Sequence, residues 1–467
     1  MLFFSPIFLF VFLPTVFLLS RLIPGQRGKN ALLAAASLVF YAFGQLQYVP
    51  LFLCSIALNY TAGLLLATRF PRSRAVLTAA VVLNLGVLGV YKYTDFLLAN
   101  LNALTGAALP MTGILLPIGI SFFTFQGMSY VIDTYREPEA GTRDFLKLLL
   151  YISFFPQLIA GPIVKYHDIA DQIDCRRTSP EETAAGIRRF IRGVAKKLLI
   201  ADTAALAADA AYTALSGGVT DPRLMWLGTV CYSLQIYYDF SGYSDMAIGM
   251  GHMFGFTILE NFRFPYGADS IREFWRRWHI SLSTWFREYL YYPLGGNRRG
   301  QARAALNRFL VFLCTGSWHG ANWTFVFWGL GHGLLSSLES AGLIPVEKLR
   351  RSRPGRVLCR VYTMLAVVLL FAMFRADSLS QGFALYAALF TGAVSREGSL
   401  LLAKLISPAL ILTLIAALLL CGNLVPRLRQ RIRLPEILAN ALSLGLLCLC
   451  ILSMAKGGFH PFIYFQF

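Results

Sequence analysis

The sequence predicts an all-α protein that crosses a membrane many times. Of its 467 residues, 56% are hydrophobic and 14% are charged, and the mean hydropathy is +0.58. A soluble chain of this length usually carries about a quarter charged residues. Here apolar runs long enough to span a bilayer recur along the chain. We therefore expect one integral-membrane domain over residues 1–467, with about 11 transmembrane or re-entrant helices.

The expected helices follow the apolar segments in chain order, which are residues 2–20, 31–45, 50–68, 75–91, 112–131, 147–163, 223–240, 309–338, 357–374, 404–422 and 437–455. The first is expected to stay in the protein, because no basic residue precedes it and no small-residue cleavage site follows it. The run 309–338 is too long for one upright span, since thirty helical residues reach about 45 Å, and Gly316 and Gly320 predict a break. Gly161-Pro162 predicts that 147–163 is a re-entrant or tilted element.

The basic residues predict an orientation. Lys and Arg number 42 against 24 acids, a net charge of +18, and such charge collects beside spans on the cytoplasmic side. No charge precedes the first span and Arg21 and Arg27 follow it, so the N-terminus should be extracytoplasmic. The segment 133–200 leaves its own topology open. The C-terminus is expected outside because four arginines precede the last segment: Arg427, Arg429, Arg431 and Arg433.

Basic loops beside membrane spans explain the positive charge better than binding of nucleic acid does. A basic inner face would attract anionic lipid or a phosphorylated donor. Residues 187–199 carry the clearest case, with one apolar helical face (Ile187, Phe190, Ile191, Val194 and Leu198) and a basic remainder (Arg188, Arg189, Arg192, Lys196 and Lys197). This pattern predicts either a helix in the inner interface with its basic side toward headgroups, or a plain juxtamembrane connector.

Ionisable and sulfur-bearing residues inside apolar segments need separate interpretation. Asp239 and Asp245 are carboxylates in an apolar context, where we expect structural pairing with basic residues rather than a proton relay or a cavity lining. The eight cysteines form no CxxC pair and show no metal-like spacing with histidine. The sequence therefore indicates neither a disulfide framework nor a zinc site.

The stretch FWRRWHISLSTWFREYLYYPLGGNR, from Phe274, combines tryptophans, arginines and one histidine. Ser270 and Glu273 have the spacing of a capping box, which predicts a helix start at Ser270. Glu273 can pair with Arg277 one turn later. We expect a single amphipathic helix whose inward face carries Trp275, Trp278, His279, Leu282 and Phe286.

His319 lies in SWHGANWTFVFWGLGHG, within a run that has no Asp, Glu, Lys or Arg from Phe309 to Leu338. Burial there disfavours the imidazolium, so a neutral ring would have one nitrogen able to accept a hydroxyl proton. Gly320 beside it permits close approach of a substrate. Two histidines flanked by glycines are assigned to helix packing, His252 and His332, and two in polar or terminal segments to no chemical role, His167 and His460.

The two histidine motifs, in this order, resemble the membrane-bound O-acyltransferase family. The bacterial branch that they resemble most includes the membrane subunit of alginate O-acetyltransferase. PQLIAGPIVKY, YYDFSGYSDMAIG, NFRFPY and the N-terminal YAFGQLQYVPLFLCSIALNY are similar to further blocks of that branch. The likeness runs from the first span to about residue 338, with a motif-bearing core over 112–338, and thins over the C-terminal spans 357–455.

This resemblance implies a body of helices around a central tunnel. His319 would be the catalytic histidine and general base, and His279 would orient it, position the thioester or stabilise developing negative charge. Trp275, Trp278, Trp318 and Asn322 would line the substrate tunnel. The resemblance implies no metal and no bound cofactor, and a cytosolic acetyl-CoA or acyl-carrier thioester as co-substrate. Direct transfer and an acyl-enzyme intermediate both stay open.

The resemblance also implies a function. The protein would pass an acetyl group across a bacterial inner membrane to an extracytoplasmic hydroxyl, through a serine-hydrolase-like partner protein, for O-acetylation of an alginate-type exopolysaccharide. The same chemistry could instead serve peptidoglycan, cellulose or D-alanyl transfer to teichoic acid. Two interpretations from other classes are a proton-coupled transporter or glycan flippase, and a scaffold without catalysis. The lack of a visible internal repeat counts against a transporter.

Overall fold

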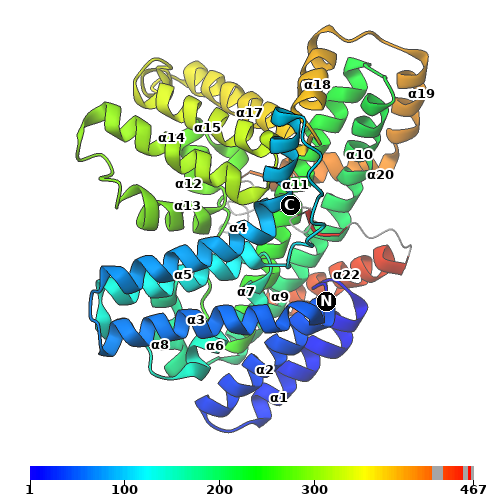
Figure 1. The fold of residues 1–467 in the computed structure, drawn as a ribbon. Helices are drawn as coiled ribbons and strands as arrows, with labels where there is room; N and C mark the ends of the chain where they lie inside the picture. Colours follow the sequence, from blue (N-terminus) through cyan, green and yellow to red (C-terminus); the bar gives the residue numbers. More distant parts are fainter. Residues whose placement is uncertain (423–434, 456–460, 464–467) are drawn as a thin grey trace. The chain divides into compact units, whose positions relative to one another are not determined.

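The computed structural model describes residues 1–422, 435–455 and 461–463. Within these ranges the chain is helical and contains no strand, which confirms the all-α prediction (Figure 1). The chain forms two compact units, one of Met1–Phe190 with Tyr243–Glu260 and the other of Ile191–Gly242 with Asn261–Phe467. Helix α11 (Pro222–Phe254) gives its first part to the second unit and its remainder to the first.

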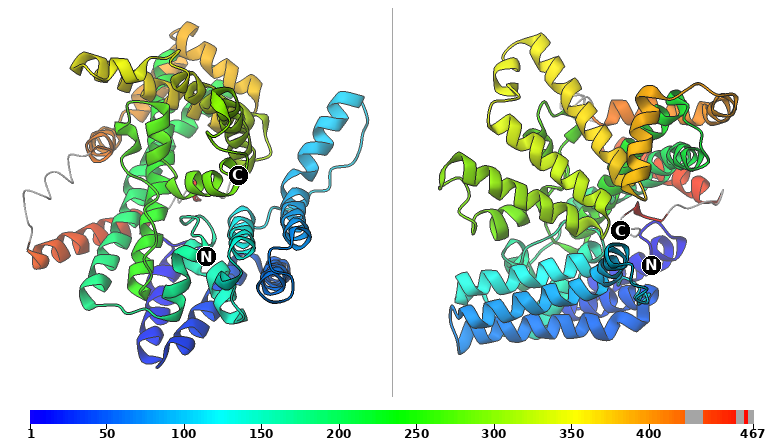
Figure 2. Two further views of the ribbon diagram at one scale, coloured as in Figure 1. Left: turned by 90° about the vertical axis from the view of Figure 1, so that its left-hand side faces the viewer. Right: turned by 45° about the horizontal axis from the view of Figure 1, so that its top comes forward.

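The first unit contains η1 (Phe8–Phe12), α1 (Leu13–Leu22), α2 (Gln26–Gln45), α3 (Val49–Thr68), α4 (Arg74–Thr105), α5 (Ile120–Arg136), α6 (Phe145–Ser153), α7 (Phe155–Leu158), α8 (Tyr166–Asp174) and most of α9 (Pro180–Ala195). Helices α3, α4 and α5 pack side by side (Figure 2). The buried amides of Asn59 and Asn84 exchange hydrogen bonds of 3.1 and 3.0 Å between α3 and α4. Gly127 of α5 leaves room for this pair, because a Cβ there would lie 2.4 Å from Asn59 Nδ2.

The run 147–163 is not a continuous helix of spanning length. Helix α6 ends at Ser153, the four-residue α7 follows, and the chain then continues without helix until α8 begins at Tyr166. Nine residues of α6 cover about 14 Å, which is about half of a hydrocarbon core. The run is therefore broken before Gly161-Pro162, and its re-entrant or tilted topology stays a prediction.

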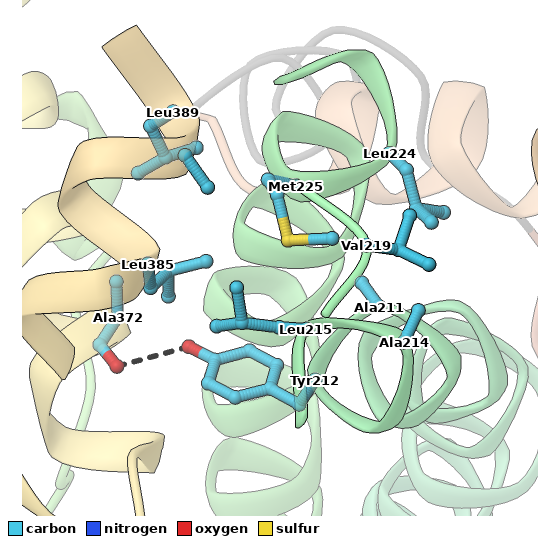
Figure 3. Close-up of a cluster of buried hydrophobic side chains, with 11 residues drawn as sticks. Ala211, Tyr212, Ala214, Leu215, Val219, Leu224, Met225, Ala372, Leu385 and Leu389 are labelled. Atoms are coloured by element: carbon cyan, nitrogen blue, oxygen red, sulfur yellow. Dashed lines mark hydrogen bonds between the residues drawn. The ribbon is translucent and has the colours of Figure 1, made fainter. Parts of the chain in front are cut away.

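The second unit contains η4 (Lys196–Ala201), α10 (Asp202–Ser216), α12 (Ile271–Arg277), α13 (Ile280–Phe286), η6 (Arg287–Tyr291), α14 (Gly300–His319), α15 (Trp323–Ser340), α16 (Val346–Leu349), α17 (Arg353–Arg375), α18 (Leu379–Thr391), α19 (Arg396–Leu405), α20 (Pro408–Leu420) and α22 (Glu436–Ala455). One of its cores joins α10, α11, α17 and α18 through residues such as Leu215, Met225 and Leu385 (Figure 3). Tyr212 donates a hydrogen bond of 2.9 Å to the carbonyl oxygen of Ala372 at this core.

The predicted break in 309–338 is confirmed. Helix α14 ends at His319, Gly320 is extended, and Asn322 caps α15 by accepting from Thr324 N at 3.1 Å. The two helices then pack closely against each other (Figure 1). Glycines allow this approach, because a Cβ on Gly316 would lie 2.4 Å from the carbonyl oxygen of Phe325.

Five helices among the described residues are long and apolar enough to cross a membrane: residues 26–68, 74–105, 180–216, 353–375 and 436–455. A sixth span results if α19 and α20, which meet at 73°, form one broken crossing. The first apolar run gives a shorter apolar helix, Phe8–Leu22. The multi-pass character of the chain is thus confirmed, whereas the number of about 11 helices and the orientation of both termini stay predictions.

Two basic residues of the run 187–199 point inward. Arg189 pairs with Asp245 at 2.8 Å and with Glu260, and Lys197 lies 2.9 Å from Asp202 and 3.0 Å from Asp239. The expected structural pairing of Asp239 and Asp245 is confirmed. The prediction that the whole basic side faces headgroups is wrong for Arg189 and Lys197, because carboxylates hold both side chains: Asp239 and Asp245 of α11, Glu260 after it, and Asp202 at the start of α10. The arginines at 427–433, from which the orientation of the C-terminus is predicted, lie outside the described residues, and so does His460.

Candidate active site

Helix α12, which leads to His279, begins as the sequence predicts. The hydroxyl of Ser270 accepts a hydrogen bond of 3.0 Å from Glu273 N. Arg277 Nε donates to Glu273 at 2.8 Å, which confirms the predicted pair. The buried carboxylate of Glu339 accepts from the two preceding N–H groups, Ile271 at 2.7 Å and Arg272 at 3.2 Å. All three initial donors of the helix are therefore satisfied.

The prediction of one continuous helix through His279 is wrong. Helix α12 ends at Arg277, and His279 adopts a left-handed conformation (φ 44, ψ 54) before α13 starts at Ile280. This conformation is uncommon for a residue other than glycine. Contacts from Asn261 and Arg263 hold the break open: Ile280 N donates to Asn261 O at 3.0 Å, and Arg263 N donates to Arg277 O at 2.9 Å. The helical spacing of the sequence thus ends at His279.

The contacts of His279 determine its tautomer. Its ring is fully buried, and its Nδ1 lies 3.3 Å from Asn261 Oδ1. That amide oxygen also accepts from Ser281 N at 3.1 Å and from Ser281 Oγ at 2.9 Å, so its position is set by a backbone donor. An amide oxygen only accepts, and Nδ1 therefore carries the proton while Nε2 keeps a lone pair. Burial lowers the pKa of His279 below its ordinary value, which keeps the ring neutral.

His319 shares an aromatic enclosure with His279. The two ring centroids are 6.4 Å apart, and both rings contact Trp318, at 5.0 Å from His319 and 6.0 Å from His279. Phe240 closes the His279 side at 4.7 Å. The His319 side is closed by Trp328 at 5.1 Å and Phe374 at 5.3 Å. At this spacing one substrate atom could lie within hydrogen-bond distance of both imidazoles.

The other residues predicted to line a tunnel lie around this enclosure rather than between the histidines. Trp278 is buried against Phe262, Phe274 and Phe371. Asn322 caps α15 and donates to Asp377 O at 2.9 Å, so its amide has a structural role. Trp318 contacts both imidazoles. The tunnel itself stays a prediction.

Trp275 packs beside His332, the glycine-flanked histidine that was assigned to packing. The two ring centroids are 5.2 Å apart, and Phe274 stacks on His332 at 6.0 Å with an interplanar angle of 1°. His332 is fully buried, and neither ring nitrogen has a hydrogen-bond partner among the described residues. A ring enclosed by aromatic side chains in this way fits the packing assignment.

Sequence reasoning missed two residues that hold the site in place, Asn261 and Glu339. Asn261 lies between Glu260 and Phe262 at the start of the NFRFPY block, and these neighbours give no sign in the sequence that its amide is buried. Glu339 is the first acid after residues 289–338, a run without Asp or Glu. Within the described part of the chain, no three His, Cys, Asp or Glu side chains gather as a metal site would require.

The chain is similar to known proteins over much of its length. Residues 136–371, which include both histidines and the four predicted tunnel residues, match the membrane-bound O-acyltransferase family. A probable alginate O-acetylase AlgI of Pseudomonas putida is 38% identical over the whole of both chains, and one of Azotobacter vinelandii is 44% identical over 84% of this chain and 78% of its own. A peptidoglycan O-acetyltransferase of Helicobacter pylori is 38% identical over 81% of this chain and 78% of its own.

Proposed function

The chain belongs to the membrane-bound O-acyltransferase family, and from this membership we propose that it moves an acetyl group from a cytosolic thioester to an extracytoplasmic hydroxyl for O-acetylation of an alginate-type exopolysaccharide. The observation that carries the proposal is the pair of buried imidazoles, His279 and His319, in one aromatic enclosure. Transfer from a thioester to oxygen mainly requires a base that removes the hydroxyl proton. A neutral buried histidine supplies such a base.

His319 acts as this general base. As the acceptor oxygen attacks the thioester carbonyl carbon, the hydroxyl proton passes to a ring nitrogen of His319. The carbon–sulfur bond then breaks, and the same proton passes to the departing thiolate. The products are an acetyl ester and a free thiol, and His319 returns to its neutral form, so neither a metal nor a bound cofactor is required.

His279 positions the reacting groups rather than stabilising an oxyanion. Because Nδ1–H of His279 donates to Asn261 Oδ1, the remaining nitrogen of the neutral ring is a hydrogen-bond acceptor. Stabilising a negative oxygen requires a donor. His279 can therefore accept from the substrate hydroxyl or from an N–H of His319, and in either case orients the proton that is transferred.

The acceptor is proposed from the relatives. The curated relatives named for alginate are 38% identical over the whole chain or up to 44% identical over most of it, which favours an alginate-type exopolysaccharide. The Helicobacter pylori relative, named for peptidoglycan, makes peptidoglycan the second candidate. We propose acetyl-CoA or an acyl carrier as the donor, and a serine-hydrolase-like extracytoplasmic protein as the partner that receives the acetyl group.

The test uses the purified full-length protein in nanodiscs, supplied with radiolabelled acetyl-CoA and the polysaccharide with its partner protein. His319→Ala and His319→Gln should lower label transfer by at least about a hundredfold, because general-base catalysis contributes about that much. His252→Gln, a partly exposed histidine of the other unit, should transfer label like the wild type. Equal transfer by the His319 variants and the wild type would remove His319 from the mechanism. Absence of transfer by the wild type would refute acetyl-CoA as donor.

A further inference from the structure

The segment 294–308, here called the arginine loop, consists of the turn before α14 and the first two turns of that helix. Gly295, Gly296 and Gly300 have φ values of 103, 54 and 84, which favour glycine. The fully buried amide of Asn307 donates to the carbonyl oxygens of Leu294 at 3.3 Å and Gly296 at 3.0 Å. These bonds tie the turn back onto α14.

Positive charge in the arginine loop has no acidic counterpart. Residues 289–338 contain no Asp or Glu, and the ion pairs among the described residues involve none of its four arginines, Arg298, Arg299, Arg303 and Arg308. Three other arginines of the same unit, Arg223, Arg277 and Arg375, each pair with a carboxylate at 2.8 or 2.9 Å. The arginine loop is therefore a cluster of cations without anions.

Buried polar atoms in the arginine loop lack partners. The Nε atoms of Arg303 and Arg308 are shielded from solvent and have no acceptor among the described residues, and Asn307 Oδ1 has no donor. Leaving a buried donor unsatisfied costs free energy, and most for a charged group. Arg299, Arg303 and Asn307 follow one another at four-residue spacing, so they lie along one face of the helix. Asn307 already donates to the turn, so the donors that this face offers to an anion come from Arg299 and Arg303.

The arginine loop is connected to His319 through a single helix. The same helix, α14, starts in the loop and ends at His319. Its 20 residues place the two ends about 30 Å apart. The pantetheine arm of a thioester is shorter than this, but Arg303 and Arg308 lie 16 and 11 residues before His319, about 24 and 17 Å along the axis, where phosphate groups at the far end of an extended arm would reach them. The helix N-terminus adds partial positive charge where those phosphates would lie.

We propose that the arginine loop binds the phosphate groups of the acetyl donor while the thioester reaches toward His319. This inference rests on the proposed function and adds the place where the donor is recognised. Arginine suits it, because its planar fork binds phosphate oxygens in pairs. Arg298 and Arg299 are exposed, whereas the solvent-shielded Nε atoms of Arg303 and Arg308 in the folded loop favour a donor that enters the protein over a lipid headgroup.

The test compares two donors on the full-length protein in zwitterionic nanodiscs: acetyl-CoA and S-acetyl-pantetheine, which has no phosphate. The variants Arg298→Gln/Arg299→Gln and Arg303→Gln should raise the KM for acetyl-CoA by about tenfold or more, the equivalent of one lost charge-assisted contact. The KM for S-acetyl-pantetheine and both kcat values should not change. The control Arg351→Gln/Arg353→Gln removes two exposed charges of the same unit and should leave all values unchanged.

The other possible results of this experiment each contradict the proposed role of the arginine loop. Equal KM changes for both donors would mean that the loop only supports the fold, and unchanged KM values would mean that it does not bind the donor; either result overturns the inference alone. A defect that appears only in nanodiscs containing anionic phosphatidylglycerol would assign the loop to lipid headgroups and also overturn it. No transfer by the wild type from either donor would refute free acetyl-CoA as the donor in the proposed function and would overturn this inference with it.

Discussion

Asn261 Oδ1 lies 3.3 Å from Nδ1 of His279 and accepts, at the same time, from Ser281 N at 3.1 Å. The backbone donor holds the amide in one orientation, so the ring of His279 can present only one tautomer. A second effect is mechanical, because Ile280 N donates to the carbonyl oxygen of the same asparagine at 3.0 Å. Asn261, which lies outside the helix pair, thus contributes to the backbone break and also orients the ring of His279.

Replacing Asn261 should therefore impair catalysis beyond any loss of stability. Asn261→Ala removes the acceptor and should lower kcat by about ten- to a hundredfold, the range seen when an orienting partner is lost. Asn261→Asp keeps an acceptor and adds a negative charge, which raises the pKa of His279. The rate of the Asp variant should then fall at a higher pH than the wild type as the medium is acidified, because His279 becomes protonated earlier. The pH dependence of kcat checks this, with Asn102→Ala of the first unit as control. Identical pH profiles of the Asp variant and the wild type would contradict it.

In this region, the features that could be predicted from the sequence are those set by residues close together in the chain. Ser270 and Glu273 are three residues apart, so the helix start could be recognised from their spacing. Gly316 and Gly320 lie inside an apolar run of excess length, which predicted the break between α14 and α15. The assignment of His279 and His319 to one site came from the family resemblance, and the structure places their rings in the same enclosure.

The predictions that the structure contradicts were wrong because of residues far away in the sequence. The break at His279 depends on backbone hydrogen bonds with Asn261 and Arg263. Helical periodicity is a pattern among neighbouring residues, so it does not predict these bonds. Arg189 and Lys197 were placed on an outward basic face, but their partners Asp245 and Asp239 come about 50 residues later in the chain. Charge on a helix is ordinarily solvated, so only the partners reveal that a particular side chain points inward.

Glu339 should act on the site through the position of α12. Its carboxylate accepts from Ile271 N and Arg272 N, and its own helix α15 begins three residues after the break at Gly320. Glu339→Ala leaves two donors unsatisfied, which should lower the stability by about 1–3 kcal/mol and also reduce kcat. Glu339→Gln keeps one acceptor and should recover part of both losses. Thermal unfolding and kcat are measured together, with the exposed Glu347→Gln as control. Full activity of Glu339→Ala at reduced stability would show that the carboxylate supports the fold alone.

The cluster of Lys197, Asp202 and Asp239 should be sensitive to which partner is removed. Lys197 and Asp239 are almost completely buried, and Asp239 Oδ2 also accepts from Ile463 N at 2.8 Å. Lys197→Met leaves two neighbouring carboxylates without their shared cation and should destabilise the protein by about 3–5 kcal/mol. Asp239→Asn retains the contact of Lys197 with Asp202 at 2.9 Å and should cost less. Thermal unfolding of both variants in detergent checks the order. A larger loss for Asp239→Asn would mean that the bond to Ile463 outweighs the ion pairs.

His167, which was assigned no chemical role, should make the stability of the first unit depend on pH. Its Nδ1 lies 2.9 Å from Asp133 Oδ2, and this hydrogen bond raises the pKa of His167 above its ordinary value near 6.5. A raised pKa in the folded state means that the charged ring is favoured by folding. The stabilisation is therefore complete below the ordinary pKa and is lost as the pH rises through the folded value. The side chain is 47% exposed, so the effect should stay below about 1 kcal/mol. Melting temperatures between pH 5.5 and 8.5 should fall slightly for the wild type and not for His167→Gln, whereas parallel curves would contradict the ion pair.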